Sequence, residues 1–336
     1  MNDGVQVIVP REVPLGGPRA MTVRRTLPAK ERSFVGAWCF VDHYGPDDVA
    51  ESGGMDVAPH PHCGLATVSW LFSGEVEHRD SLGTLALVRP GEVNLMTAGR
   101  GISHSEVSTP GTTVLHGAQL WLVLPSGSAE VEPRFEHHAP EVVQVAEGVR
   151  AQVFVGSLWG SVSPVRVESP LIGAEVVLAP GAVVDVPVPE GFEVAVLVDR
   201  GSVSFAGRDL VRAELGVVEA ARQPSSALLE AGAQGARVLV LGGEPFGEEI
   251  VMWWNFIGRT HEDVVAAREA WEAGASASGE VGRFGIVGGY TGEVSRIPAP
   301  ALPGVRLRPR GNRGSRRDRS DRGRSGFAGA EAPALS

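Results

Sequence analysis

The sequence predicts an all-β protein, and three observations support that class. The 336 residues include 44 glycines and 24 prolines, a composition that favours short strands joined by turns over a helical bundle. Apolar, β-branched runs recur between these turn residues at the spacing of a β-sandwich or barrel. A weak internal repeat indicates two stacked antiparallel β-barrels of the jelly-roll type.

Seven apolar runs are the clearest expected strands: Thr67–Phe72, Leu85–Val88, Glu92–Met96, Ala118–Pro125, Glu175–Pro180, Glu193–Val198 and Ala236–Gly243. One segment, "THEDVVAAREAWEAG", has the period of a helix instead. Thr260 and Asp263 resemble a capping box at its start, and Gly274 ends it. Its apolar face is formed by three residues: Val264, Ala267 and Trp271.

The internal repeat consists of an apolar strand, a glycine turn and a second strand, at residues 67–77 and again at residues 193–204. Just before it, two histidines of the first copy correspond to two valines of the second: His60 and His62 to Val186 and Val188. If the copies are equivalent, only the N-terminal barrel has a polar interior. The alternative is that any two hairpins resemble each other this closely, and the pattern alone does not decide.

Charge is distributed unevenly. Nine arginines and three acidic residues lie between Val305 and Ser336, so this segment carries +6, whereas the remainder carries about −16 of the total of −10. A negative body disfavours nucleic acid binding. Residues 309–336 are predicted to be a disordered tail, because they lack apolar side chains to bury. The alternative for the tail is contact with RNA or an acidic partner.

The sequence also predicts a cytoplasmic protein without a membrane partner. No run approaches the roughly 18 apolar residues of a membrane span, and the first residues lack the layout of a signal peptide. The two cysteines, Cys39 and Cys63, cannot form a disulfide framework.

Two short sequence motifs predict a metal site. "APHPHCG" places His60 and His62 at positions i and i+2, and "GISHSEVS" gives His104 and Glu106 the same spacing. Residues at i and i+2 of a strand project from one face, so the two pairs can bring three imidazoles and one carboxylate to a point. This donor set suits Fe(II), Mn, Ni, Cu or Zn. We interpret four other histidines as surface or hydrogen-bonded core residues: His78, His116, His137 and His138.

Longer sequence segments resemble the pirin family of the cupin superfamily. "HPHCGLATVSWLFSGEVEHRDSLGT", "RPGEVNLMTAGRGISHSE" and "LHGAQLWLVLP", with the upstream "VDHYGP", are similar to its N-terminal domain. "PFGEEIVMWWNFIGRTHEDVVAAREAW" and "PAPALP" are similar to the C-terminal region of many bacterial pirins. The resemblance implies a bicupin, with an N-terminal barrel over residues 1–135, a C-terminal barrel over residues 136–308 and the tail over residues 309–336.

The resemblance further implies one metal ion, typically Fe(II), in the N-terminal barrel. The residues that match its ligands are His60, His62, His104 and Glu106. Pirins usually read H-P-H-R-G-F-E-T, and this chain departs from that pattern with Cys63 at the basic position and Ala66 at the acidic one. A carboxylate near the metal can serve as general base toward a substrate hydroxyl, so Ala66 weakens the prediction of dioxygenase activity. The parity of Cys63 predicts a buried, inert thiol in preference to a redox sensor.

Two functions follow from the resemblance. The first is a dioxygenase, because family members resemble quercetinases, which open a flavonol ring with dioxygen. Trp70, Asn94 and Met96 are then expected to line the pocket for a small aromatic substrate. The second is a regulatory protein whose metal oxidation state alters its binding to a transcription factor or metabolic enzyme, and Ala66 favours this alternative.

Overall fold

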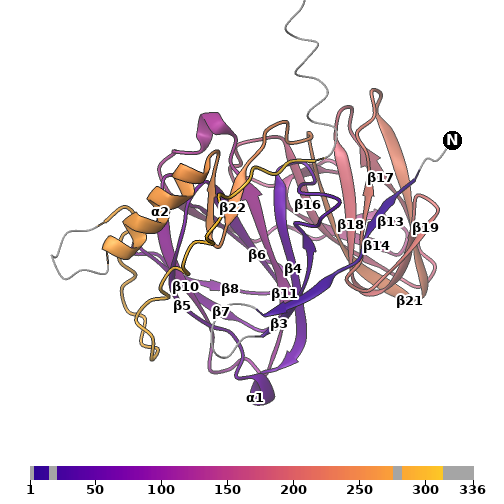
Figure 1. Cartoon of the computed structure of the whole chain (residues 1–336). Helices are drawn as coiled ribbons and strands as arrows, with labels where there is room; N and C mark the ends of the chain where they lie inside the picture. The colour runs from indigo at the N-terminus through magenta and orange to yellow at the C-terminus, as the bar shows by residue number, and fades with distance from the viewer. Residues whose placement is uncertain (1–3, 15–20, 275–281, 313–336) are drawn as a thin grey trace, which may run out of the picture.

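A computed structural model describes residues 4–14, 21–274 and 282–312, and it confirms the predicted all-β architecture in two halves (Figure 1). Residues 313–336, most of the predicted tail, lie outside the described residues. Neither α-helix in the described ranges combines the length and apolar character that a bilayer crossing needs.

The N-terminal half contains two sheets, with strand orders β12-β9-β6-β11-β4-β3-β2 and β5-β10-β7-β8. Its strands are β2 (Arg11–Pro14), β3 (Thr22–Leu27), β4 (Trp38–Asp48), β5 (Asp56–His62), β6 (Leu65–Ser73), β7 (Val76–Asp80), β8 (Leu85–Val88), β9 (Val93–Thr97), β10 (Ile102–Ser108), β11 (Val114–Val123) and β12 (Arg134–His138). A single helical turn, α1 (Val49–Ser52), follows β4, and a 3₁₀ turn (Ser126–Ser128) follows β11.

The C-terminal half is one ten-stranded sheet with the main order β1-β20-β18-β21-β16-β14-β13. Its strands are β1 (Gln6–Ile8), β13 (Val143–Ala146), β14 (Val149–Leu158), β15 (Ser161–Val162), β16 (Leu171–Leu178), β17 (Val183–Val188), β18 (Glu193–Phe205), β19 (Arg208–Val211), β20 (Leu215–Val218) and β21 (Ser225–Gly243). The two longest strands, β18 and β21, pair with other strands along both of their ends, and the sheet bends around its own core.

The strand pairings of the two halves repeat. In the first half β5 pairs with β10, β10 with β7, and β7 with β8. In the second, β17 pairs with β21, β21 with the end of β18, and that end with β19. The expected hairpin at residues 67–77 is not formed, because β6 and β7 enter different sheets on either side of Gly74. The N-terminal half is therefore two facing sheets and not one closed barrel.

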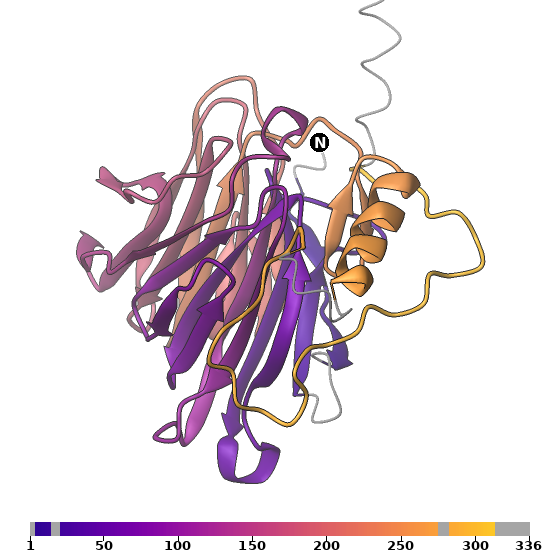
Figure 2. The same ribbon diagram turned by 90° about the vertical axis from the view of Figure 1, so that its left-hand side faces the viewer.

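Both ends of the chain cross between the halves. The N-terminal strand β1 pairs with β20 in the C-terminal sheet. After β21 the chain returns to the first half as the hairpin β22 (Val251–Trp253) and β23 (Phe256–Gly258), followed by α2 (His261–Ala273) (Figure 2). The amide of Ile297 then donates to the carbonyl of Pro59 on β5. Residues 58–64, which include the predicted metal ligands His60 and His62, therefore contact residues about 190 to 240 positions further along the chain.

The predicted helix is confirmed in detail. The Thr260 hydroxyl accepts from the amide of Asp263, whose carboxylate accepts from the amide of Thr260, so both halves of the capping box are present. The predicted apolar face is buried against the hairpin, and the helix ends before Gly274.

Candidate metal centre

His60 and His62 lie on β5, the edge strand of the four-stranded sheet. Pro61 can stand between them because an edge strand pairs on one side alone and does not need every N–H. The strand ends in a tight turn at Gly64, which has a φ of +72°. A Cβ there would lie 2.1 Å from the carbonyl oxygen of Ile257, so this turn requires glycine.

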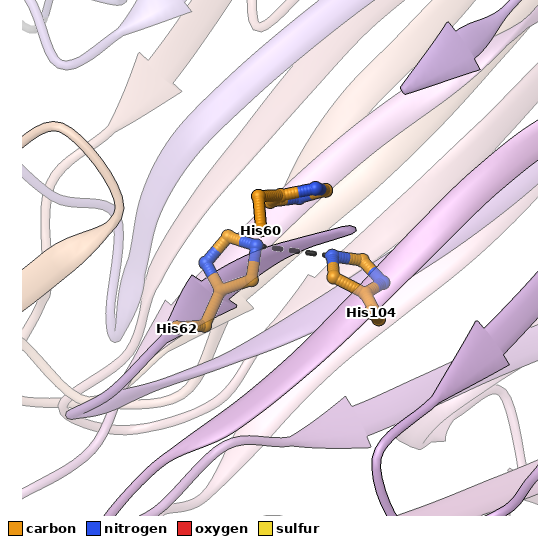
Figure 3. Close-up of side chains that lie close together, drawn as sticks. All are labelled: His60, His62 and His104. Atoms are coloured by element: carbon orange, nitrogen blue, oxygen red, sulfur yellow. Dashed lines mark hydrogen bonds between the residues drawn. The ribbon is translucent and has the colours of Figure 1, made fainter. Parts of the chain in front are cut away.

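The pairing of β5 with β10 brings the two histidine-containing motifs together. His104 lies directly opposite His60 in the register, and its Nε2 atom is 3.0 Å from Nε2 of His62 (Figure 3). One ring nitrogen from each of the three histidines lies within 4.8 Å of the others, and all three side chains are buried. Three of the four predicted ligands therefore converge.

Glu106 is placed differently. The register between the strands shifts between His104 and Glu106, as at a β-bulge, and such irregularities redirect side chains. The Glu106 carboxylate forms a second group of possible ligands with His104 and His78, again within 4.8 Å. Its Oε1 accepts a hydrogen bond of 3.2 Å from the Ser69 hydroxyl across the interior.

Burial sets the protonation of this cluster. It lowers the pKa of His60 to about 4, and it holds the pKa of His62 and His104 well below the usual histidine value. Neutral imidazole, the form that binds metal, is therefore favoured at neutral pH. Burial also raises the pKa of Glu106.

The three histidines and Glu106 open onto a cavity of about 630 Å³. Phe40 and Trp121 form one wall as stacked rings with centroids 4.0 Å apart. The opposite rim comes from the C-terminal segment, through the β22–β23 turn and the chain near Ile297. The remaining lining residues are Pro14, Arg25, Pro28, Met55, Val57, Gln119, Met252, Trp253, Trp254, Asn255, Pro298 and Pro300. The lining of the cavity is mostly apolar.

None of the three residues expected in the substrate pocket lines this cavity. Trp70 is buried between the two halves, where its Nε1 donates to Glu175 and its ring stacks on Phe154. Asn94 and Met96 share the face of Ser69 in the register of β6 with β9, but they lie away from the cavity. The Asn94 side chain is hydrogen bonded to His137, and Met96 packs in a small core beyond the metal cluster.

The two departures from the pirin pattern face away from the cavity. Ala66 pairs with Leu122 and packs in the core between the halves, so a longer side chain here would project away from the histidines. Cys63 is buried against Phe256 and the helix, and burial raises the pKa of its thiol to about 11. A thiol in this state is a poor nucleophile at neutral pH.

A second buried histidine group joins the two halves. His43 and His116 both place Nε2 against one oxygen of Asp199, at 2.8 and 2.6 Å. The other oxygen of Asp199 accepts from Arg237 at 2.6 Å, and Arg24 lies 3.4 Å from Nδ1 of His43. A guanidinium group on the carboxylate and a second one on His43 disfavour a divalent cation here, so this group is a hydrogen-bonded interdomain cluster.

Sequence reasoning did not anticipate three parts of the site. The stacked Phe40 and Trp121 lie on separate strands that meet only in the sheet. The rim at Trp253 and Trp254 comes from the returning C-terminal segment. His78 was interpreted as an ordinary histidine, yet with Asp80 it has the same i, i+2 spacing as the two predicted pairs, and that spacing was the available signal.

The family is decided by the comparison with known proteins. The pirin family model matches residues 20–122, and the model of the pirin C-terminal cupin domain matches residues 173–277. The chain belongs to the pirin family. Both cupin domains of a pirin are therefore present, and the predicted bicupin fold is confirmed.

Two proteins similar to this pirin are named after quercetin 2,3-dioxygenase. A protein of Pseudomonas aeruginosa with the provisional name quercetin 2,3-dioxygenase is 39% identical over 299 residues, which cover 89% of this chain and 91% of the relative. The crystal structure of a quercetin 2,3-dioxygenase from Acinetobacter baumannii superimposes with a TM-score of 0.83 at 37% identity, covering 92% of this chain and 98% of that one. A bacterial pirin of Escherichia coli in complex with nickel(II) shares the fold, with a TM-score of 0.55, 19% identity and coverage of 71% and 100%.

Proposed function

We propose that this pirin is a metal-dependent dioxygenase of the quercetinase type, which opens the ring of a flavonol-like substrate at a mononuclear Fe(II)-type site. The observation that carries the proposal is the convergence of three buried imidazoles on a cavity of about 630 Å³ whose lining includes aromatic side chains. The names of the two most similar proteins described above support the substrate class.

The donor set fits a divalent transition metal. The Nδ1 atom of His60 is 2.9 Å from the carbonyl oxygen of Ala58 and donates to it, which leaves the Nε2 lone pair free for a ligand. His62 and His104 face each other through Nε2, an arrangement that brings two lone pairs together unless a proton or cation lies between them. Glu106 would complete the set with a carboxylate. A bound Fe(II)-type ion would supply electron transfer to dioxygen and a Lewis acid for substrate oxygens.

The chain's own residues would bind and orient the substrate. Phe40 and Trp121, held against each other and by Arg25 over the Phe40 ring, would give a planar ring system aromatic side chains to pack against. Glu106 is the carboxylate among the described cavity-lining residues, and as a metal ligand it would be a poorer base toward a substrate hydroxyl. The aromatic rim at Trp253 and Trp254 would exclude water from the bound ring.

The test is consumption of quercetin under air by protein loaded anaerobically with Fe(II). We expect the flavonol absorbance to fall with the wild-type protein and to stay constant with His104→Ala. A matched control is His138→Ala, which removes a partly exposed histidine on the outer strand β12. If the loaded wild-type protein and His104→Ala leave the absorbance equally unchanged, the proposal fails.

A further inference from the structure

A buried chain of side chains lies behind His104, on the side away from His62. Nδ1 of His104 is 3.3 Å from Nδ1 of His78, and Nε2 of His78 is 3.3 Å from Oδ2 of Asp80. The three residues are 1%, 3% and 1% exposed, respectively. Such a chain in the protein interior has to have a consistent direction of hydrogen donation, because water does not reach it.

The sheet builds this chain from the i, i+2 spacing of β7. His78 and Asp80 project from one face of that strand, and they lie opposite Glu106 and His104 of β10. Asp80 also closes the turn after β7, because its Oδ1 accepts from the amides of Leu82 and Thr84 at 2.9 and 3.0 Å. The carboxylate is therefore fixed by the backbone, and its second oxygen is directed at His78.

The carboxylate determines the direction of the whole chain. An ionised Asp80 accepts only, so a neutral His78 carries its proton on Nε2 and presents a lone pair at Nδ1. His104 then donates from Nδ1, and its Nε2 is left with the lone pair that faces the cluster. By contrast, His60 is held by the Ala58 carbonyl, and Nδ1 of His62 has no hydrogen-bond partner among the described residues. His104 is the predicted ligand whose tautomer depends on other side chains.

We propose that His78 and Asp80 are positioning residues that hold His104 in its metal-binding tautomer and orientation. This inference rests on the metal site of the proposed function. Outer partners of ligating histidines typically contribute 10–100-fold to metal affinity. The competing arrangement makes His78 a ligand itself, together with His104 and Glu106. The cavity argues against that arrangement, since His60, His62, His104 and Glu106 line it and His78 does not.

The decisive variant is Asp80→Asn, which keeps the shape of the side chain and replaces one of its two acceptor oxygens with an NH₂ donor. The new amide oxygen would retain the Leu82 and Thr84 amides, and its NH₂ group would donate to His78. His78 would then carry its proton on Nδ1 and require His104 to accept there, which moves the His104 proton to Nε2 and blocks the ligand atom. His78→Phe removes the acceptor and keeps a ring against Phe135, whose centroid is 4.8 Å away. His78→Gln restores both an acceptor and a donor.

The experiment is calorimetric titration of the full-length, metal-free protein with Ni(II), combined with ¹⁵N NMR of the histidine tautomers. We expect Asp80→Asn and His78→Phe to bind Ni(II) about 10–100-fold more weakly than wild type, and His78→Gln to recover most of the loss. The NMR spectra should show His104 protonated on Nδ1 in the wild type and on Nε2 in Asp80→Asn. Asp56→Asn, an exposed carboxylate on β5, is the matched control and should bind as wild type does.

The outcomes separate the two proposals. If the wild type binds Ni(II) and Asp80→Asn binds it equally well with an unchanged His104 tautomer, the positioning role is wrong and the metal site stands. If His78→Phe abolishes binding while His60→Val retains it, His78 is a ligand and the inference is overturned. If the wild type binds no ion, the proposed function itself fails. Should His78→Phe not fold, Asp80→Asn and His78→Gln still decide, because both retain the polar packing.

Discussion

The interiors of the two cupin halves have the same strand pairings and opposite chemistry. His104 faces His60 in the first half as Ala227 faces Val186 in the second. Glu106 likewise faces His78 where, in the second half, two apolar residues face each other: Leu229 and Phe205. The apolar residues belong to one continuous core, whereas the polar ones line or adjoin a cavity. The comparison shows that the fold does not require the histidines, so their presence in one half points to a ligand.

The largest effect is expected when the first interior is converted to the second. His60→Val should reduce bound metal from about one ion per chain to none, because the remaining donors no longer surround the ion. The metal-free variant should unfold at the same or higher urea concentration than the metal-free wild type, since a buried imidazole is replaced by an apolar side chain. Elemental analysis after dialysis and urea denaturation measure both. Loss of stability in the metal-free state would show that His60 has a structural role.

The interdomain cluster provides a contrast, since its histidines are already satisfied by protein groups. Asp199→Asn removes the charge that holds His43, His116 and Arg237, and breaking a buried pair in this way costs about 3–5 kcal/mol of unfolding free energy. Metal content should not change. Urea denaturation with elemental analysis tests this, and a variant as stable as wild type would remove the distinction between structural and ligand-binding histidines.

The reverse conversion should fail. Val186→His places an imidazole in the C-terminal core, where Val186 is fully buried among apolar side chains. We expect a loss of about 3 kcal/mol in unfolding free energy, from an unpaired polar group and a larger side chain, and no gain of metal. Val186→Ala is the matched control for lost packing alone. A stable variant that binds an additional ion would contradict the comparison.

The smallest expected effect is on pH dependence. Burial lowers the pKa of His43 in spite of its bond to Asp199, so the unfolded chain takes up a proton below about pH 6.5 that the folded chain does not. Burial opposes ionisation of Asp199, but hydrogen bonds from His116 and His43 outweigh it and hold its pKa well below the usual range. Stability should therefore fall below about pH 6.5 and again below about pH 4.

Thermal denaturation of the wild type and of Asp199→Asn at several pH values measures this contribution. The difference in stability between the two proteins should shrink as the pH falls through 4, since the unfolded wild-type chain takes up a proton on Asp199 there and the variant has no such group. A difference that is constant from pH 7 to pH 3 would exclude Asp199 as the source.

Local sequence patterns were reliable where the chemistry is local. The capping box of α2, the β-strand at Leu85–Val88 and the shared face of His60 and His62 all follow from spacings of a few residues. The pocket was harder to predict, because parity alone does not fix the position of the cavity along a strand: Asn94 and Met96 share the face of Ser69 and still do not line the cavity. Trp70 has the opposite parity and packs between the halves.

The sequence by itself determined the all-β class, the helix, the family and the two i, i+2 pairs of predicted ligands, since each depends on residues close together in the chain. Only the tertiary structure decided which groups surround those pairs. The pairing with β10 brings His104 to His60, the face of β7 places Asp80 opposite His104, and the returning C-terminal segment covers the cavity. These contacts join residues that are tens to hundreds of positions apart. The register of the strands that make these contacts is set by the packing of whole sheets, which no short stretch of sequence determines.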